Sequence, residues 1–284
     1  MRIKLWGTRG SIAVSHADVA RHGGATTCIE VELGANANPQ TPERVIFDLG
    51  TGVVGLGRAH FDLGRTAVFQ THLHWDHIQG FPFFAGLFNP KNHLDFFAVP
   101  REGHSLRDVL EQQMTSPTFP IGLNALPCGR TFHDVRPDAC VQLGDLRASA
   151  AEMSHPSGST AWRLDHRGYG FVFSGDCEVQ AGGREALISL AKGADVLVMD
   201  AQYFPDEYET RRGWGHSTAV DAVEVAIEAG VGQLVLTHHD PAHNDARLDE
   251  KLAIARRVAG RRIWVENGFD GMVIDLANVT GLAV

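Results

Sequence analysis

Short apolar runs that end at a polar residue recur along the chain. They predict β-strands at residues 3–6, 27–33, 45–47, 67–71, 171–173, 196–199, 234–237 and 263–266. Longer segments predict α-helices at residues 103–116, 217–229 and 246–259. In the second of these helices, Ser217 or Thr218 can cap the first turn, and Gly230 is typical of a C-terminal stop. No low-complexity linker divides the chain, so we expect one domain, residues 1–284, built from two similar halves.

Five acidic or histidine residues stand just beyond the ends of these strands: Asp48, His72, Asp176, Asp200 and His238. A buried strand cannot easily hold an unpaired charge, but the loop that leaves it can direct one into a shared crevice. We therefore expect these side chains to form one rim. Each of them, taken alone, could instead be a helix cap or a turn residue, and for Asp48 the two alternatives are equally open.

The strand exit with the most acidic and histidine residues carries an H-x-H-x-D-H motif, formed by His72, His74, Asp76 and His77. Imidazole and carboxylate groups suit zinc or a neighbouring transition metal. His72 and His74 lie two residues apart, so an extended backbone directs both to one side. Asp76 and His77 follow where we expect the chain to turn into a helix, which directs them to a second position. The motif therefore favours two metal ions over one, the alternative being a chance cluster on a solvated loop.

Composition narrows the class of protein. The 284 residues carry a formal net charge of −9, which gives no general attraction to nucleic acid, although a local basic patch stays open. The four cysteines are scattered, so neither a cysteine zinc site nor a secreted disulfide scaffold is indicated. The start of the chain lacks the apolar core of a signal peptide, and no run approaches about eighteen apolar residues. We therefore expect a cytoplasmic protein with no membrane contact.

Three segments carry weaker expectations. Residues 50–55 match G-x-G-x-x-G, but a dinucleotide site needs an acidic residue about twenty positions on, where the metal motif stands. We interpret these glycines as a tight turn whose backbone N–H groups could face an anion. The Phe- and Pro-rich segment at residues 81–127 could form a lid over the site or pack in the core. Residues 36–42 are expected to form a hairpin-like loop.

Several motifs together resemble the metallo-β-lactamase superfamily, and within it the branch of ribonuclease Z and the small cyclic-phosphate phosphodiesterases. The motifs are D-L-G-T-G at 48–52, the histidine motif at 72–77, S-H-P at 154–156, S-G-D at 174–176, G-H-S-T at 215–218 and L-T-H at 236–238. The histidine motif marks only the superfamily, whereas G-H-S-T followed by L-T-H points to the phosphodiesterase branch. The resemblance implies an α/β fold, the four-layer αββα sandwich of two mixed sheets flanked by helices, with a dinuclear metal centre at one edge.

The resemblance also implies a ligand set. His72, His74 and His155 would hold one ion; Asp76, His77 and His238 would hold the second. Asp176 would bridge the two ions, and Asp76 would also orient the attacking water. His239, beside His238, is an alternative ligand. The ions would be divalent, Zn²⁺ first and Mn²⁺ as its rival.

His216 has a different implied role. In the resembled branch, a histidine here protonates the leaving oxygen while an acidic residue, here Asp200, holds its imidazole. A phosphodiester needs such an acid because an alkoxide is a poor leaving group. The alternative is that His216 only helps to cap the helix that follows it.

The prediction of the substrate depends on the short segment between His155 and Asp176. Bacterial ribonuclease Z carries a long basic arm that grips tRNA between the segments matching His155 and Asp176, and only residues 156–175 lie between them here. Because phosphate contacts dominate nucleic-acid affinity, this disfavours a nucleic-acid partner. We expect a metal-dependent hydrolase, a phosphodiesterase acting on a small or cyclic phosphodiester. The alternatives are an arm-less endoribonuclease, a hydrolase of another bond such as a thioester, and a metal-bound signalling module without turnover. The sequence does not reveal the oligomeric state; the resembled branch is often dimeric, which leaves a homodimer open by analogy alone.

Overall fold

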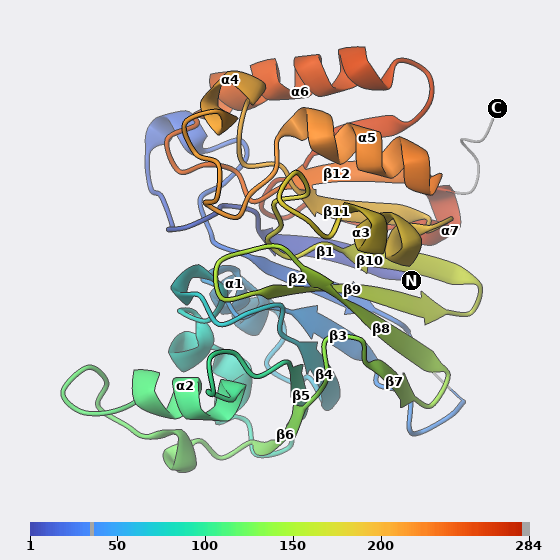
Figure 1. Cartoon of the computed structure of the whole chain (residues 1–284). Coiled ribbons are helices and arrows are strands. Elements are labelled where there is room, and N and C mark those ends of the chain that lie inside the picture. The colour runs from blue at the N-terminus through green and yellow to red at the C-terminus, as the bar shows by residue number, and fades with distance from the viewer. Residues whose placement is uncertain (35–36, 280–284) are drawn as a thin grey trace.

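Two β-sheets pack face to face, with helices on both outer faces (Figure 1). The computed structural model describes residues 1–34 and 37–279. Within them each sheet has seven strands, and the layers confirm the expected αββα sandwich of two mixed sheets flanked by helices. Residue 36, where the expected loop at 36–42 begins, lies outside the described residues.

The first sheet has the strand order β14-β1-β2-β3-β4-β5-β6. Its strands are β1 (Arg2–Gly7), β2 (Cys28–Glu32), β3 (Arg44–Phe47), β4 (Arg65–Phe69), β5 (His93–Ala98), β6 (Gly129–Asp134) and β14 (Val273–Asp275). The second sheet has the order β13-β12-β11-β10-β9-β8-β7. Its strands are β7 (Cys140–Leu143), β8 (Leu146–Met153), β9 (Ser159–His166), β10 (Tyr169–Phe173), β11 (Val196–Asp200), β12 (Gln233–Thr237) and β13 (Trp264–Asn267).

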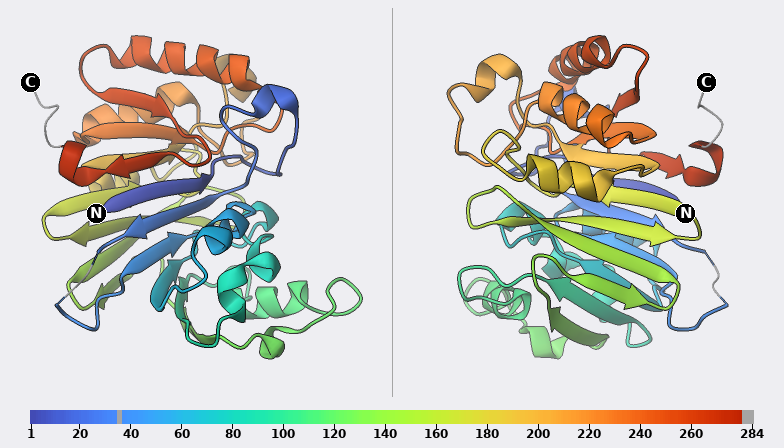
Figure 2. Two further views of the ribbon diagram at one scale, coloured as in Figure 1. Left: turned by 180° about the vertical axis from the view of Figure 1, so that it is seen from behind. Right: turned by 45° about the vertical axis from the view of Figure 1, so that its right-hand side comes forward.

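The helices lie outside the two sheets. The α-helices are α1 (Gly52–Ala59), α2 (Leu106–Gln113), α3 (Arg184–Ala191), α4 (Pro205–Tyr208), α5 (Ala219–Ala229), α6 (Asp245–Ala259) and α7 (Leu276–Val279). Short 3-10 helices are η1 (Ala17–Val19), η2 (Trp75–His77), η3 (Phe81–Phe83), η4 (Ala85–Phe88) and η5 (Leu123–Ala125). Figure 2 shows from two further sides that α5 and α6 cover the second sheet, while α1 and α2 lie beside the first. None of the described helices combines the length and apolar character needed to cross a bilayer.

The central strands are buried on both faces, which explains their continuous apolar runs. In β11, Val196 and Val198 face the core between the sheets, whereas Leu197 and Met199 face the helices α3, α5 and α6. Aromatic rings join the sheets: the ring of Phe47 in β3 lies 5.6 Å from that of Phe171 in β10, centroid to centroid. This packing fixes the two sheets against each other and aligns their edges.

Parallel pairing brings the strand exits together. Strands β3, β4, β5 and β6 pair parallel in the first sheet, and β10, β11, β12 and β13 do so in the second. Their carboxyl ends therefore share one edge of each sheet, as the exits of β3, β4, β10, β11 and β12 were expected to do.

The expected tight turn at residues 50–55 is wrong. Helix α1 begins at Gly52, and the backbone N–H groups of Gly50, Thr51 and Gly52 donate to oxygens of Thr26 and Thr27. These groups are therefore occupied within the protein and do not face an anion.

The segment 81–127 mostly packs in the core. Phe81, Phe84 and Leu87 are buried against the first sheet, while Phe83 is 64% exposed. The expected helix at 103–116 is shorter, running from Leu106 to Gln113 with Ser105 as its cap. Within this segment, the turn before α2 and the half-buried Val109 of α2 line a cavity beside His72 and His74.

Candidate metal centre

The H-x-H-x-D-H motif lies directly after β4. Residues 70–74 are irregular, and the 3-10 helix η2 then turns the chain, so that His72 and His74 face one position and Asp76 and His77 another. His155 comes from the connection between β8 and β9. Asp176 follows β10 and His238 follows β12, so seven side chains from four segments meet at one sheet edge.

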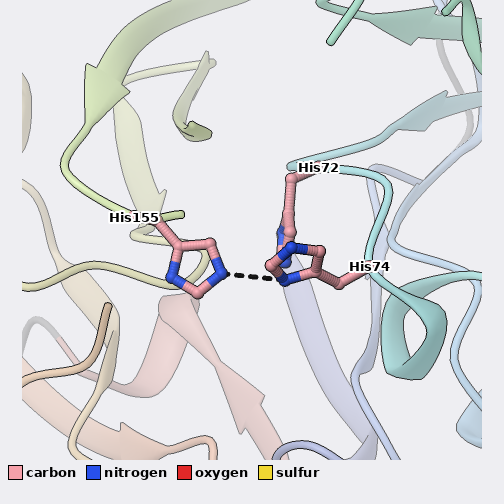
Figure 3. Close-up of side chains that lie close together, drawn as sticks. All are labelled: His72, His74 and His155. Carbon is pink, nitrogen blue, oxygen red and sulfur yellow. Dashed lines mark hydrogen bonds between the residues drawn. The ribbon is translucent and has the colours of Figure 1, made fainter. Parts of the chain in front are cut away.

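Three of these residues form a histidine triad: His72, His74 and His155. One nitrogen from each lies within 4.8 Å of the others. Nε2 of His155 is 3.0 Å from Nδ1 of His74, and Figure 3 shows these two rings meeting with His72 beside them. Three imidazole nitrogens that converge on one point are typical of a transition-metal site.

The other four form a carboxylate cluster: Asp76, His77, Asp176 and His238. His77 Nε2 lies 3.3 Å from Asp76 Oδ2 and 3.2 Å from Asp176 Oδ1. His238 Nε2 lies 3.2 Å from Asp76 Oδ2 and 3.1 Å from Asp176 Oδ2. Asp176 also reaches the histidine triad, because its Oδ2 is 3.5 Å from His72 Nε2. The carboxylate of Asp176 therefore lies between the two groups.

The pKa values of the two groups diverge. Burial lowers the pKa of His72 well below its usual range and that of His155 to about 4. Burial also disfavours charged His238, but Asp176 and Asp76 outweigh it and raise its pKa to about 10. For His77, burial is likewise outweighed by Asp176, Asp76 and Asp48, and its pKa lies well above the usual range. The carboxylate cluster thus attracts positive charge strongly, and the triad offers neutral nitrogens.

The residues fit divalent metal ions on two further observations. His72 Nε2 and Asp176 Oδ1 are buried and have no hydrogen-bond partner, although buried polar atoms are nearly always paired. Both atoms point to ligand positions of the two groups. Neutral imidazole and carboxylate are also the donor types that divalent transition metals bind.

Neighbouring groups hold the imidazoles in place. His77 Nδ1–H donates to Asp48 at 2.7 Å, and His238 Nδ1–H donates to Gln202 Oε1 at 2.9 Å. His155 Nδ1–H donates to the carbonyl of Gly215 at 2.8 Å. Each contact leaves the other ring nitrogen directed at the centre, as is usual for histidine ligands of metals.

Asp48 contacts residues of both groups. Of its two interpretations from the sequence, a site residue or a helix cap or turn residue, the structure favours the first. Besides His77, it accepts hydrogen bonds from the backbone and hydroxyl of Thr71, and that hydroxyl lies 3.0 Å from His72 Nδ1. Asp48 and His238 both have positive φ, 57° and 56°. Non-glycine residues in this conformation are strained and concentrate at functional sites.

His216 lies beside the centre. Its Nδ1–H donates to Asp200 Oδ2 at 2.8 Å, and its ring stacks on that of His238 with centroids 4.7 Å apart. Thr218 caps helix α5 by accepting from Asp221 N, so capping does not require His216. His239 instead donates Nε2–H to the carbonyl of Gly268, and it belongs to none of the metal-ligand groups found in the described residues.

Four residues that shape the site were not found by the sequence analysis. Gln202 orients His238, and the backbone N–H of Ser11 donates to Asp76 Oδ2 at 2.8 Å. A Cβ on Gly10 would lie 2.4 Å from the ring of His238, so only glycine fits there. Buried Glu178 binds the loop before His216, as described next. The only available signal was position, since Gln202 and Glu178 each stand two residues after a strand-exit aspartate.

Glu178 organises the loop that precedes His216. It accepts the hydroxyl of Tyr208 at 2.7 Å and the backbone N–H groups of Gly213 and Gly215 at 2.9 and 2.8 Å. The carbonyl of Gly215 in turn orients His155. Glu178 therefore fixes a loop shared by the histidine triad and His216.

Comparisons with known proteins show the family of the chain. The sequence matches the beta-lactamase superfamily domain over residues 43–239, which contain every member of the triad and the carboxylate cluster. An uncharacterised protein of Mycobacterium leprae is 32% identical over 219 residues, covering 72% of this chain and 69% of that one. Ribonuclease Z of Haloarcula marismortui is 25% identical over 324 residues, covering 96% and 97%. The crystal structure of the metallo-beta-lactamase fold protein YhfI from Bacillus subtilis is similar in fold, with TM-score 0.71, 20% identity and coverage of 96% and 98%.

The chain therefore belongs to the metallo-β-lactamase superfamily, a family of metal-dependent hydrolases. Within that superfamily it falls in the ribonuclease Z-like branch, as its sequence motifs indicated.

Proposed function

We propose that this protein is a dinuclear metal-dependent phosphodiesterase that hydrolyses small phosphodiesters. The observation that carries the proposal is Asp176, whose carboxylate lies between two complete sets of ligand atoms with the His216–Asp200 pair beside them. One set alone would support a mononuclear site. Two sets that share a carboxylate suit a reaction in which a phosphate must be held and attacked at once.

The geometry supports the following ligand roles. His72, His74 and His155 would hold one ion, Asp76, His77 and His238 the other, and Asp176 would bridge them. When bound, two divalent ions lower the pKa of a shared water and neutralise charge on the phosphate. Five imidazoles favour Zn²⁺, with Mn²⁺ as the rival.

The protein's own residues would complete the reaction. Asp76 would orient the water, whose oxygen forms the new bond to phosphorus as the bond to the leaving oxygen breaks. His216 would deliver a proton to that oxygen, with Asp200 holding Nδ1–H so that Nε2 acts as the donor. One water is consumed: its hydroxyl goes to phosphorus and its remaining proton restores His216.

A small substrate is favoured over tRNA by the segment between His155 and Asp176. Strands β9 and β10 take up most of it, joined by a short turn at residues 167–168, which leaves no length for an extended arm. The net charge of −9 also opposes binding of a polyanion.

An arm-less endoribonuclease is the second candidate, because a ribonuclease Z matches 96% of the chain. Metal-loaded protein should be assayed on bis(p-nitrophenyl) phosphate, cyclic nucleotides, ribose cyclic phosphates and precursor tRNA at low salt, where electrostatic RNA affinity is strongest. We expect turnover of the small phosphodiesters and little processing of tRNA. The reverse pattern would favour the ribonuclease, and no turnover of any of them would refute the proposal.

A further inference from the structure

A cavity of about 170 Å³ opens beside the histidine triad. His72 and His74 form its inner wall, and the outer walls come from the turn before α2, from α2 itself and from the loop between β8 and β9. His216 does not line it. The cavity therefore adjoins the side of the metal centre that His72 and His74 face.

Cross-links hold the outer walls together. Arg101, only 9% exposed, donates to Glu152 at 2.5 Å and to Thr160 Oγ1 at 2.7 Å, and so joins the turn before α2 to strands β8 and β9. Ser157 Oγ donates to Glu102 Oε1 at 2.8 Å across the cavity rim. Glu102 and Ser157 both have positive φ, 49° and 63°, an unfavourable conformation for residues other than glycine. Such strain is typical of a site whose shape is maintained for binding.

The chemistry of the walls limits the ligand. Leu73 and Val109 supply apolar surface, and the positive charge of Arg101 is balanced by Glu152 and by Glu102 at the rim. The cavity therefore offers no net positive charge to a second phosphate. Its volume is below the roughly 300–1,000 Å³ of pockets that hold whole drug-sized ligands, so it has room for one ring.

We propose that this cavity binds the substituent that stays on phosphorus, and that this substituent is a single uncharged ring such as a sugar or a heterocycle. The inference rests on the proposed phosphodiesterase function. His216 lies against Asp200 and His238, whereas the cavity is bounded by His72 and His74. In a phosphodiester whose two substituents are separate groups, an in-line displacement that places the leaving oxygen at His216 puts the retained substituent elsewhere, and this cavity receives it.

Two substrates that release the same leaving group test the inference: p-nitrophenyl phenyl phosphate and methyl p-nitrophenyl phosphate. The wild type should favour the phenyl ester by roughly tenfold or more in kcat/KM. Val109→Trp, which fills the cavity, should remove most of that preference while the methyl ester is hydrolysed nearly as before. Val109→Ala, which keeps the fold with less disturbance, should change kcat/KM for the phenyl ester alone.

The matched control is Val220→Trp. Val220 is also a half-buried valine on a helix, and it lines a separate surface cavity of about 520 Å³ between α3, α4 and α5. This variant should leave the phenyl-to-methyl ratio unchanged. Equal losses on both esters in the Val109 variants, or no preference in the wild type, would overturn the inference while leaving the phosphodiesterase intact. Absence of p-nitrophenolate from both esters would refute the proposed function itself, and the inference with it.

Discussion

The histidine triad and the carboxylate cluster share one sheet edge but differ in charge. The triad offers three imidazoles whose pKa values are lowered by burial, and Asp176 is the carboxylate nearest to it. The carboxylate cluster has two aspartates that raise the pKa of His77 and His238. The contrast shows that one sheet edge can offer two unequal groups of metal-ligand side chains, the carboxylate cluster with negative charge and the triad with neutral nitrogens.

The largest effect on turnover should come from outside both groups. His216→Ala should retain both ions and the fold but lose roughly 10²–10⁴-fold in turnover, because the leaving alkoxide loses its proton donor. The loss should shrink for p-nitrophenyl esters, whose leaving group needs no proton. Steady-state kinetics on an alkyl and a p-nitrophenyl ester, with metal analysis, measures this. Loss of metal, or equal losses on both esters, would remove His216 from the acid role.

Gln202→Leu should sharpen the contrast by lowering the metal affinity of the carboxylate cluster alone. It removes the acceptor that orients His238, and such contacts typically change metal affinity by about 10–100-fold. Competition with a chelator should show one ion weakened and the other unchanged. Gln180→Leu is the control, since Gln180 contacts Asp221 on helix α5 instead. Weakening of both ions would show that the two positions are not separable.

Glu178→Gln should instead lower the metal affinity of the histidine triad. The amide keeps an acceptor but presents an NH₂ group to the N–H donors of Gly213 and Gly215, so the loop that orients His155 loosens. We expect the ion of the histidine triad to bind up to roughly tenfold more weakly, a smaller effect because it passes through the backbone. Glu224→Gln, at an exposed position of helix α5, should change nothing. If Glu178→Gln and Gln202→Leu weaken the same ion, the division into two groups is wrong.

The last effect is on folding stability alone and concerns a buried cation behind the carboxylate cluster. Lys251 is fully buried, donates to the carbonyls of Ala201 and Gln202, and burial lowers its pKa to about 7. Above pH 7 the folded protein releases this proton while the unfolded chain keeps it up to a pKa near 10.5. The free energy of unfolding should therefore rise with pH, approaching about 1.4 kcal/mol per pH unit from this group.

Urea unfolding of chelator-treated wild type and Lys251→Met between pH 7 and 9 checks this. The variant has no such proton to release, so the wild type should gain stability relative to it as the pH rises. A difference between the two proteins that is independent of pH would show that Lys251 is charged throughout.

Much of the centre was predictable because most of its side chains stand at the exits of apolar strands, His155 after β8 being the exception. In β11 and β12, residues 196–199 and 234–236 are continuous apolar runs, and Asp200 and His238 stand at or just beyond the ends of these strands, at the sheet edge. Strand β8 was missed because its sequence, LRASAAEM, has three alanines and a serine and no continuous run of large apolar residues. Glu178 could not be found because its partners are backbone N–H groups 35 and 37 residues away, whose direction depends on the fold.

The central claim is that Asp176 joins two metal positions in one centre. Elemental analysis of metal-loaded wild type, Asp200→Ala and Asp176→Ala tests it most directly. We predict two divalent ions per chain in the wild type and in Asp200→Ala, and at most one in Asp176→Ala, because the carboxylate of Asp176 reaches both groups. A wild type that never exceeds one ion per chain, or an Asp176→Ala variant that keeps two, would contradict the account.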